Sequence, residues 1–271
     1  MDWARAKKIL IVLLVMLNLT LTAAIISRAI GGGADRAFYS NVTRVLGDRG
    51  VTMRCDFPKQ ITSSEQLVYG DGARFVESCA KALISVDRRA AWVEMPGRES
   101  LRYINLRPDE NLNTASVSAL DADIRRVLGE WGVDMAGFTT DYTAKTANGE
   151  HYYQFILDYK GKLVFDSNIN VYVNGDGGIA EIAISYREIK GVTIDKLMSV
   201  IPAYQVLLKN YYEEGAVVES ISIGFMGQNM ARENPFKESE ECAVWRVRLE
   251  DGSERFFEAA YGDEIARYSH L

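Results

Sequence analysis

Few residues in this chain of 271 residues have side chains suited to acid–base or nucleophilic chemistry. It has two histidines, His151 and His270, and three cysteines, Cys55, Cys79 and Cys242. A histidine beside a carboxylate or a cysteine can move protons or activate a nucleophile. Neither histidine stands in a motif that supplies such a partner. We therefore expect both to be solvated surface residues and assign no catalytic residue.

Motifs that hold phosphates, metals or an activated serine are also missing from the sequence. It contains no Gly-x-Ser-x-Gly, no His-Glu-x-x-His, no glycine-rich phosphate loop and no Cys-x-x-Cys. Asp121 and Asp123 lack the glycine and the terminal glutamate of a calcium loop, so they fit a solvated helix face. Paired carboxylates can hydrolyse glycans, but none of the 37 acidic residues is singled out as such a pair. The sequence predicts no metal, no cofactor and no enzymatic activity.

The cysteines allow two interpretations. A disulfide between Cys55 and Cys79 would close a loop of about 25 residues if both lie outside the cytoplasm. An odd number of widely spaced cysteines is more typical of buried free thiols than of a disulfide framework. We expect free thiols and leave the Cys55–Cys79 pairing open.

Tyrosines supply the candidate external binding surface. Tyr152 and Tyr153 belong to a strand-like run over 152–159, and Tyr211 and Tyr212 end a helical stretch. Alternation along a strand brings some side chains to an exposed face, and protein interfaces are rich in tyrosine. Core packing is the simpler explanation for most of them, because aromatic side chains dominate protein interiors. These four tyrosines remain the candidate surface.

The first thirty residues predict a membrane anchor. The run from Ile9 to Ile26 is apolar and uncharged. As a helix it spans about 27 Å, close to the ~30 Å hydrocarbon core of a bilayer. Arg5, Lys7 and Lys8 precede it, so the positive-inside tendency leaves the N-terminus in the cytoplasm and the C-terminal domain outside. A cleaved signal peptide is the alternative, with small residues at 22–24, but its apolar region is normally shorter.

Three polar residues lie inside the predicted anchor: Asn18, Thr20 and Thr22. Their side chains can bond back to their own helix, or Asn18 can bond across to another transmembrane helix. A bond between helices contributes about 0.6–2 kcal/mol to their association. Both alternatives stay open, and these three residues are the candidate transmembrane contact.

Composition predicts a folded, acidic domain behind the anchor. The chain is 48% apolar and 25% charged, as in ordinary globular proteins, and its net charge is −6 at pH 7. No basic stripe is present, so nucleic-acid binding has no electrostatic support. The length that remains is enough for one large domain or two small ones.

Hydrophobic periodicity predicts an α+β fold. Helices are expected at 35–46, near 73–83, at 117–131, and from 193 through Pro202 to Tyr212. Strands are expected at 51–55, 101–105, 152–159, 163–165, 168–174, 179–188, 217–226, 243–249 and 255–260, with a polar loop at 228–241.

These elements predict a domain organisation in which a helix followed by antiparallel strands occurs twice. The two helix-on-antiparallel-sheet units cover about 113–190 and 191–271, and each sheet leaves one face for a helix. Ahead of them we expect a cytoplasmic tail at 1–8, a single transmembrane helix at 9–30, a glycine-rich joint at 31–34 and a first external part at 35–112.

Both ends of the chain resemble the YycI family. The start, Met-Asp-Trp-Ala-Arg-Ala-Lys-Lys at 1–8, precedes a single anchor. The end contains Val-Trp-Arg-Val at 244–247, Asp251-Gly252, and Ala-Ala-Tyr-Gly-Asp-Glu-Ile at 259–265. This ending is also similar to that of PepSY-type domains. Chain length and the order of helices and strands agree along nearly the whole sequence, and the central region matches in pattern only.

The resemblance implies a regulator without catalytic residues. YycI proteins are membrane-anchored and act with the related protein YycH on the sensor histidine kinase of the WalK/WalR (YycG/YycF) system. That system controls cell-wall metabolism in Gram-positive bacteria. The implied partners are a WalK-like kinase and a YycH-like protein, and the implied location is the cell membrane. An anchored external module that binds a wall polymer or peptide is the alternative, and a wall hydrolase is a third hypothesis.

Overall fold

The computed structural model describes residue 14 and residues 32–58, 64–86, 91–195, 200–227 and 241–268. Its helices are α2 (Gly32–Asp48), α3 (Ala73–Val86), α4 (Val117–Glu130) and α5 (Ala203–Lys209). The mixed α+β class expected from periodicity is confirmed. Most of the strands form one large sheet. It has two parts, and different helices pack on each part.

Sheet I is the larger part and is antiparallel. Its strand order is β5 (Phe138–Lys145), β6 (His151–Asp158), β7 (Leu163–Val173), β8 (Ile179–Ser185), β4 (Ser100–Asn105) and β3 (Ala91–Gly97). Asn174 at the β7–β8 turn accepts hydrogen bonds from the backbone of Asp176 and Gly178, as asparagine side chains commonly do in turns.

Sheet II consists of β1 (Thr52–Met53), β10 (Val217–Gly227), β11 (Glu241–Leu249), β12 (Glu254–Glu258) and β13 (Glu264–Tyr268). The two parts meet through a short parallel pairing, in which Gly224 and Phe225 of β10 lie opposite Leu163 and Val164 of β7. β2 (Ser64–Tyr69) and β9 (Ile189–Asp195) form a separate two-stranded sheet.

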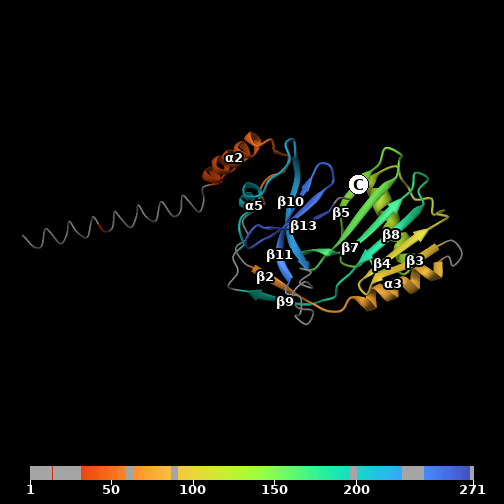
Figure 1. Ribbon diagram of the computed structural model, residues 1–271. Coiled ribbons are helices and arrows are strands. Elements are labelled where there is room, and N and C mark those ends of the chain that lie inside the picture. Colours follow the sequence, from red (N-terminus) through yellow and green to blue (C-terminus); the bar gives the residue numbers. More distant parts are fainter. Residues whose placement is uncertain are drawn as a thin grey trace, which may run out of the picture.

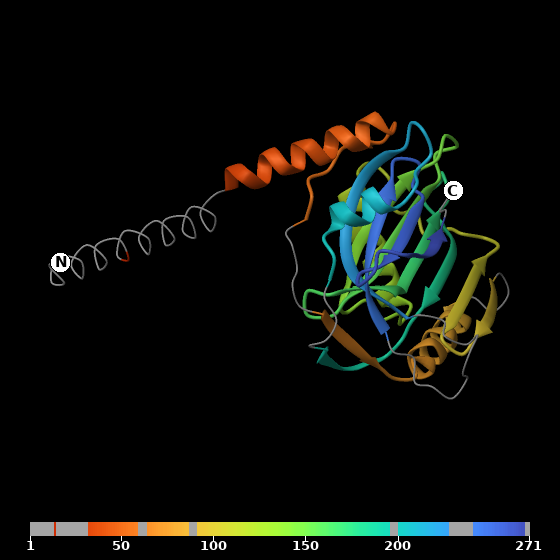
Figure 2. The same ribbon diagram turned by 60° about the vertical axis from the view of Figure 1, so that its left-hand side comes forward.

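Helices cover the outer face of each part. Figure 1 shows α2 and α5 on the side of β10–β13, and α3 beside β3 and β4; Figure 2 shows the same separation from another side. The core of sheet I contains residues of α3 and α4 together with Phe155, and that of sheet II contains residues of α2 and α5 together with Trp245. The helices are therefore divided between two cores.

Local sequence explains α4. The side chain of Ser116 accepts a hydrogen bond from the backbone of Ala119 and caps the first turn. Buried residues recur three and four positions apart, at Leu120, Ile124, Val127 and Leu128, so one stripe of the helix faces sheet I. Gly132 follows the helix with φ +84°, the left-handed conformation that ends helices.

The two sheets face each other with their remaining sides. On β11, Trp245 and Val247 belong to the core beneath α2 and α5, whereas Val244 belongs to a smaller core between the sheets. This inter-sheet core also contains Ile156, Phe165, Met226 and Phe256. Alternation along β11 therefore brings Arg246 and Arg248 toward sheet I rather than toward solvent.

A buried cluster of four charged side chains connects the sheets. Arg246 donates through both Nη atoms to the carboxylate of Asp141 on β5, at 2.6 and 2.7 Å. Arg248 donates to the same carboxylate at 2.5 Å and, through Nε, to Glu254 at 2.9 Å. Arg246 also lies 4.5 Å from the ring centre of Phe165. All four charged side chains are at least nine-tenths buried.

The arginines control the protonation of Asp141. Burial by itself raises the pKa of this carboxyl, but the hydrogen bonds and charges of Arg246 and Arg248 outweigh burial and hold the pKa below its usual value. Asp141 is therefore an anion in the folded protein. The cluster contains two cations and two carboxylates, as burial of charge requires.

The structure corrects the expectation of a helix from residue 193. Ile189–Asp195 is strand β9, and α5 covers only Ala203–Lys209, so Tyr211 and Tyr212 lie beyond the helix. The β-branched Thr193 and Ile194 favour extended backbone and pair with Gln66 and Glu65 of β2. Four strands, β2, β3, β5 and β13, occur where none was expected. The segments 163–165 and 168–174 belong to one strand, β7.

The first external part, 35–112, divides between the two sheets. α2 and β1 belong with sheet II, whereas α3, β3 and β4 belong with sheet I. Helix α2 begins at Gly32, so two of the glycines expected to form a joint lie in its first turn.

The predicted anchor at 9–30 lies outside the described residues apart from Leu14, and so do Asn18, Thr20 and Thr22. Among the residues that the structure describes, no helix has the length and apolar character needed to cross a membrane. Residues 228–240 of the polar loop expected at 228–241, and His270, also lie outside them, and Glu241 begins β11. The anchor remains a prediction from the sequence.

We predict that Asp141→Asn lowers the free energy of unfolding by about 3–5 kcal/mol, because it leaves two buried guanidinium groups with one carboxylate. Glu181→Gln, in the part-exposed ion pair with Arg102, is the matched control and costs less than about 1 kcal/mol. Denaturant titration of the detergent-solubilised full chain, followed by tryptophan fluorescence, measures both. Equal losses in the two variants would contradict a structural role for the cluster.

The lowered pKa of Asp141 also predicts a pH dependence of stability. Its contribution is fully present above the ordinary pKa near 3.8 and disappears as the pH falls through the lower folded-state value. Unfolding titrations between pH 2 and pH 5 measure this contribution to stability. The range spans about one or two units on either side of that pKa. The slope of stability against pH in this range is expected to be smaller in Asp141→Asn than in the wild type.

Candidate functional site

Two of the four candidate surface tyrosines are buried in sheet I. Tyr152 and Tyr153 are 3% and 1% exposed. The hydroxyl of Tyr153 donates to the carbonyl of Val117 on α4, and that of Tyr152 donates to Asn170 on β7. Helices cover one face of β6 and sheet II covers the other, so alternation gives neither tyrosine a solvent face. The expectation that they form a surface is wrong.

The other two tyrosines, Tyr211 and Tyr212, differ in their exposure to solvent. Tyr212 is 5% exposed and lies under the guanidinium of Arg255, whose carbon is 4.3 Å from the ring centre. Burial raises the pKa of Tyr212 above its ordinary value, so it remains a neutral phenol. Tyr211 is 80% exposed and stands at the edge of a groove. Of the four, Tyr211 alone is a surface residue.

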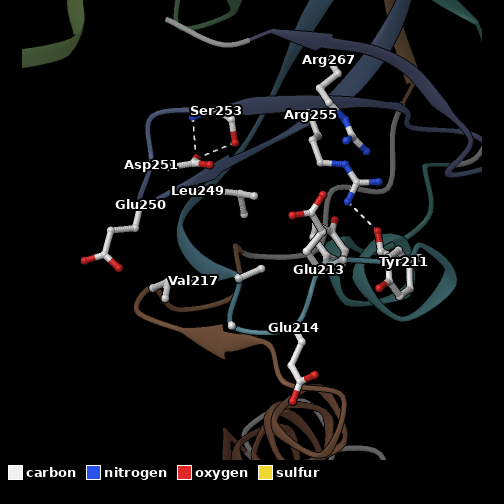
Figure 3. Close-up of a pocket in the computed structure, with 13 residues that line it drawn as sticks. Tyr211, Glu213, Glu214, Val217, Leu249, Glu250, Asp251, Ser253, Arg255 and Arg267 are labelled. Atoms are coloured by element: carbon white, nitrogen blue, oxygen red, sulfur yellow. Dashed lines mark hydrogen bonds between the residues drawn. The ribbon is translucent and has the colours of Figure 1, made fainter. Parts of the chain in front are cut away.

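The groove next to Tyr211, which we call the Tyr211 groove, has a volume of about 690 Å³. The loop 211–217 between α5 and β10 forms one side, and the β11–β12 turn, 249–253, forms the other. Arg255 and Arg267 complete the lining from β12 and β13 (Figure 3). Two turns and two strands that are distant in sequence therefore meet at this site.

The basic groups of the groove are occupied by a carboxylate. Arg255 donates to the carbonyl of Tyr211 at 2.6 Å and through Nε to Glu264 at 3.1 Å. Arg267 also donates to Glu264 at 3.1 Å. Burial raises the pKa of Glu264, but its hydrogen bonds to the two arginines outweigh burial and lower it.

The rim of the groove carries the remaining charge and is acidic. Glu213, Glu214, Glu250 and Asp251 all line it. The carboxylate of Asp251 accepts hydrogen bonds from the backbone and the hydroxyl of Ser253, and Glu250 pairs with Arg54. With the arginines held by Glu264, this rim favours a cationic group over an anion.

The groove lies against the end of α2. A smaller hollow of about 300 Å³ shares Tyr211 and Tyr212 with it and is lined by Leu46 of α2. The backbone of Gly215 donates to the carbonyl of Gly50, just beyond the helix. Glu214 points toward α2 in Figure 3, and a side chain added at Gly50 would come within 2.9 Å of it. The loop that lines the groove therefore contacts the segment that follows α2 through Gly215 and Glu214.

Among the described residues that line the groove, one hydroxyl lies beside a carboxylate. The lining contains Ser253 but no histidine or cysteine. The Ser253 hydroxyl donates to Asp251 at 2.6 Å, and a carboxylate alone is not the base that activates serine in the known triads. Within the described ranges, no group of three or more histidines, cysteines and carboxylates is placed to hold a metal ion.

The other residues with chemical potential are dispersed. His151 is half-buried on β6, and burial together with Lys145 lowers its pKa, so it is neutral at pH 7. Cys55 and Cys79 are free thiols, and burial raises the pKa of Cys79 to about 11, which makes it a poor nucleophile. Asp121 and Asp123 form ion pairs with Arg125 and Arg126 along α4.

The comparisons with known proteins give no family. No family model matches this chain, and no curated protein matches it. Among solved structures, the YpeB C-terminal domain of Bacillus megaterium is 12% identical over 72% of this chain and 96% of that domain, with a TM-score of 0.37. An uncharacterized protein from Eubacterium rectale is 11% identical over 84% of this chain and 98% of its own, with a TM-score of 0.48. Likenesses of this size carry no functional information, and membership of the YycI family remains a prediction.

We predict that Tyr211→Ala leaves the free energy of unfolding unchanged, because the side chain is solvated. Tyr212→Ala is expected to lower it by about 3–5 kcal/mol, because it opens a cavity beneath Arg255. Thermal and denaturant unfolding of the two variants measures the difference. A large loss in Tyr211→Ala would contradict its assignment to the surface.

Proposed function

We propose that this chain is a membrane-anchored, non-enzymatic regulator of a sensor histidine kinase that controls cell-wall metabolism. In this proposal it acts as YycI proteins do, through its transmembrane helix and its external domain, together with a YycH-like partner. The sequence resemblance at both ends of the chain supports the family assignment. The position of α2 is the structural observation that carries the mechanism.

Helix α2 joins the predicted anchor to the folded domain with almost no intervening chain. The anchor is predicted at 9–30, and α2 begins at Gly32. Val42 and Leu46 of α2 are buried in the core of sheet II. A displacement of sheet II would therefore act directly on the segment that enters the membrane.

Aromatic contacts hold α2 to its neighbours. The ring of Phe38 lies 4.9 Å from that of Tyr204 on α5, and Tyr39 stacks on Phe57 at 5.1 Å. Arg49, just after α2, donates to the carbonyl of Leu208 on α5 at 2.7 Å. Contacts of this kind contribute roughly 0.5–1.5 kcal/mol each. That is the scale of free energy by which a regulator biases a two-state kinase.

The alternative proposal is an external binding module for a wall polymer or peptide. The acidic rim of the Tyr211 groove and the exposed Tyr211 favour it, because together they suit a cationic ligand. The two proposals differ in their need for the anchor. A pull-down with purified wall material that recovers none of the chain would count against the binding module.

We predict that replacing Ile9–Ile26 with an unrelated apolar helix weakens control of the kinase while the external domain stays folded. The sequence of the anchor matters if it contacts the kinase, whereas any anchor suffices for a tether. A reporter gene of the two-component system measures control, and thermal unfolding checks the domain. Unchanged signalling after the exchange would refute the transmembrane route.

Rigid coupling through α2 predicts a second result. Four glycines inserted between residues 31 and 32 are expected to uncouple the domain from the anchor and reduce control as strongly as the exchange does. The same insertion at Asp176, in the exposed β7–β8 turn, is the matched control and leaves control intact. Full control with the insertion before α2 would show that α2 serves only as a tether.

A further inference from the structure

Strand β7 divides the large sheet at one point along its edge. Its first residues, Leu163 and Val164, pair with β10, and the residues from Asn168 onward pair with β8 on the same edge. On the other edge of β7, Leu157 of β6 pairs with Val164, and the neighbouring Ile156 pairs with Asn168. Residues 165–167 therefore have no strand partner on either side, and we call this place the fork.

The three fork residues point to three environments. Phe165 fills the core between the sheets. The Ser167 hydroxyl accepts a hydrogen bond from the backbone of Arg187, just after β8. Asp166 lines an open crevice of about 530 Å³, together with Gly97, Ser100, Ser185 and four charged residues: Asp71, Arg98, Glu99 and Arg187. The crevice lies beside the fork, between Asp166 of β7, the end of β8 and the β3–β4 turn.

Asp166 is held in the crevice with one oxygen unused. Its side chain is 18% exposed, and Oδ2 accepts a hydrogen bond from the backbone of Gly227 at 2.9 Å. The other oxygen, Oδ1, is buried, and no residue of the described chain donates to it. A buried carboxylate oxygen without a donor destabilises the folded state. A ligand that donates here would remove that destabilisation.

Among the described residues that line this crevice, carboxylates outnumber cations. Nε of Arg187 lies 3.4 Å from Asp166 and 3.4 Å from Glu99, so one guanidinium serves two carboxylates. Arg98 pairs with Asp71 at the rim. Burial raises the pKa of Asp166, and the charge of Glu99 raises it further, while Arg187 and the Gly227 bond act in the opposite direction. One more cation beside Asp166 would balance the site.

We propose that the fork crevice binds a ligand through a primary ammonium group, which donates to Asp166 and Glu99. An ammonium has three donors and suits two carboxylates and the Ser100 and Ser185 hydroxyls that share the crevice. The same chemistry occurs on amino sugars and on the lysine side chains of peptides. The proposal is independent of kinase control and of the Tyr211 groove.

Other occupants fit the crevice less well. An anion would compete with the carboxylates that already hold Arg187 and Arg98. Hydrolysis of a glycan needs two carboxylates on opposite sides of the scissile bond. Here Arg187 contacts both carboxylates at 3.4 Å, so they are directed at one guanidinium rather than across an open space. Binding of a cation is the function that the geometry supports.

The test is a titration of the isotope-labelled full chain in detergent micelles, followed by the backbone amide signals of Ser100 and Ser185. Glucosamine and Nα-acetyl-lysine amide are the ammonium probes and represent the two sources. N-acetylglucosamine keeps the sugar ring but replaces the ammonium with a neutral amide. We expect at least one ammonium probe to shift both signals and the neutral sugar to shift neither.

Variants assign the effect to Asp166. Asp166→Asn keeps an acceptor for the Gly227 amide and is expected to weaken binding of the ammonium probe at least tenfold. Glu99→Gln is expected to weaken it as well, and Asp176→Asn, in an exposed turn away from the crevice, leaves it unchanged. Amide spectra without ligand verify that each variant is folded. Equal shifts with N-acetylglucosamine, no shift with either amine, or unaltered binding by Asp166→Asn would overturn the proposal.

Discussion

The structure depends on the buried cluster of Asp141, Arg246, Arg248 and Glu254. The strand pairing that joins the two sheets consists of two residue pairs between β7 and β10, which is too little to fix their orientation. The cluster adds a second connection, from β5 at the edge of sheet I to β11 and β12 within sheet II. Buried ion pairs often add little net stability, because desolvation offsets their attraction. We infer that this cluster mainly specifies which faces of the sheets meet.

This constraint explains the other features of the fold. Once the inner faces are joined, each sheet has one face left, and each receives its own pair of helices. β7 pairs with β10 at its start and with β8 farther along, so residues 165–167 pair with none of the described strands, and the crevice lies beside them at the end of β8 and the β3–β4 turn. The fork thus results from joining two sheets through one shared strand.

The sequence predicted elements well where one periodicity prevailed. α4 has a serine cap and a regular apolar stripe, β6 is a short aromatic and apolar run, and β10 and β11 alternate over most of their length, so all four were expected near their observed positions. Only the last three residues of strand β9, 193–195, were expected to be helical, because they resemble a helix start ahead of Pro202. The conformation of β9 is set by pairing with β2, a distant segment that local sequence does not reveal.

The site residues were harder to predict, because they depend on what covers each face. Arg246 and Arg248 alternate with Trp245 and Val247, a pattern that ordinarily indicates a solvated strand face. Here that face meets another sheet. Tyr152 is buried for the same reason. The Tyr211 groove brings together turns at 211–217 and 249–253, and only the signal of Tyr-Tyr-Glu-Glu-Gly at 211–215 was available from sequence.

The division of the helices also bears on how the domain communicates with a membrane. Helix α2 begins the continuous described part of the chain but packs on the sheet formed by the last strands, so the two ends of the described domain form one body. The fork crevice is connected to that body through the Asp166–Gly227 hydrogen bond, and the Tyr211 groove adjoins it through Gly50. Coupling over distance requires an element with two positions that both sites bias. Among the described elements, α2 best meets this requirement. Val45 on its outer face is exposed, whereas the rings of Phe38 and Tyr39 hold the helix to Tyr204 and Phe57.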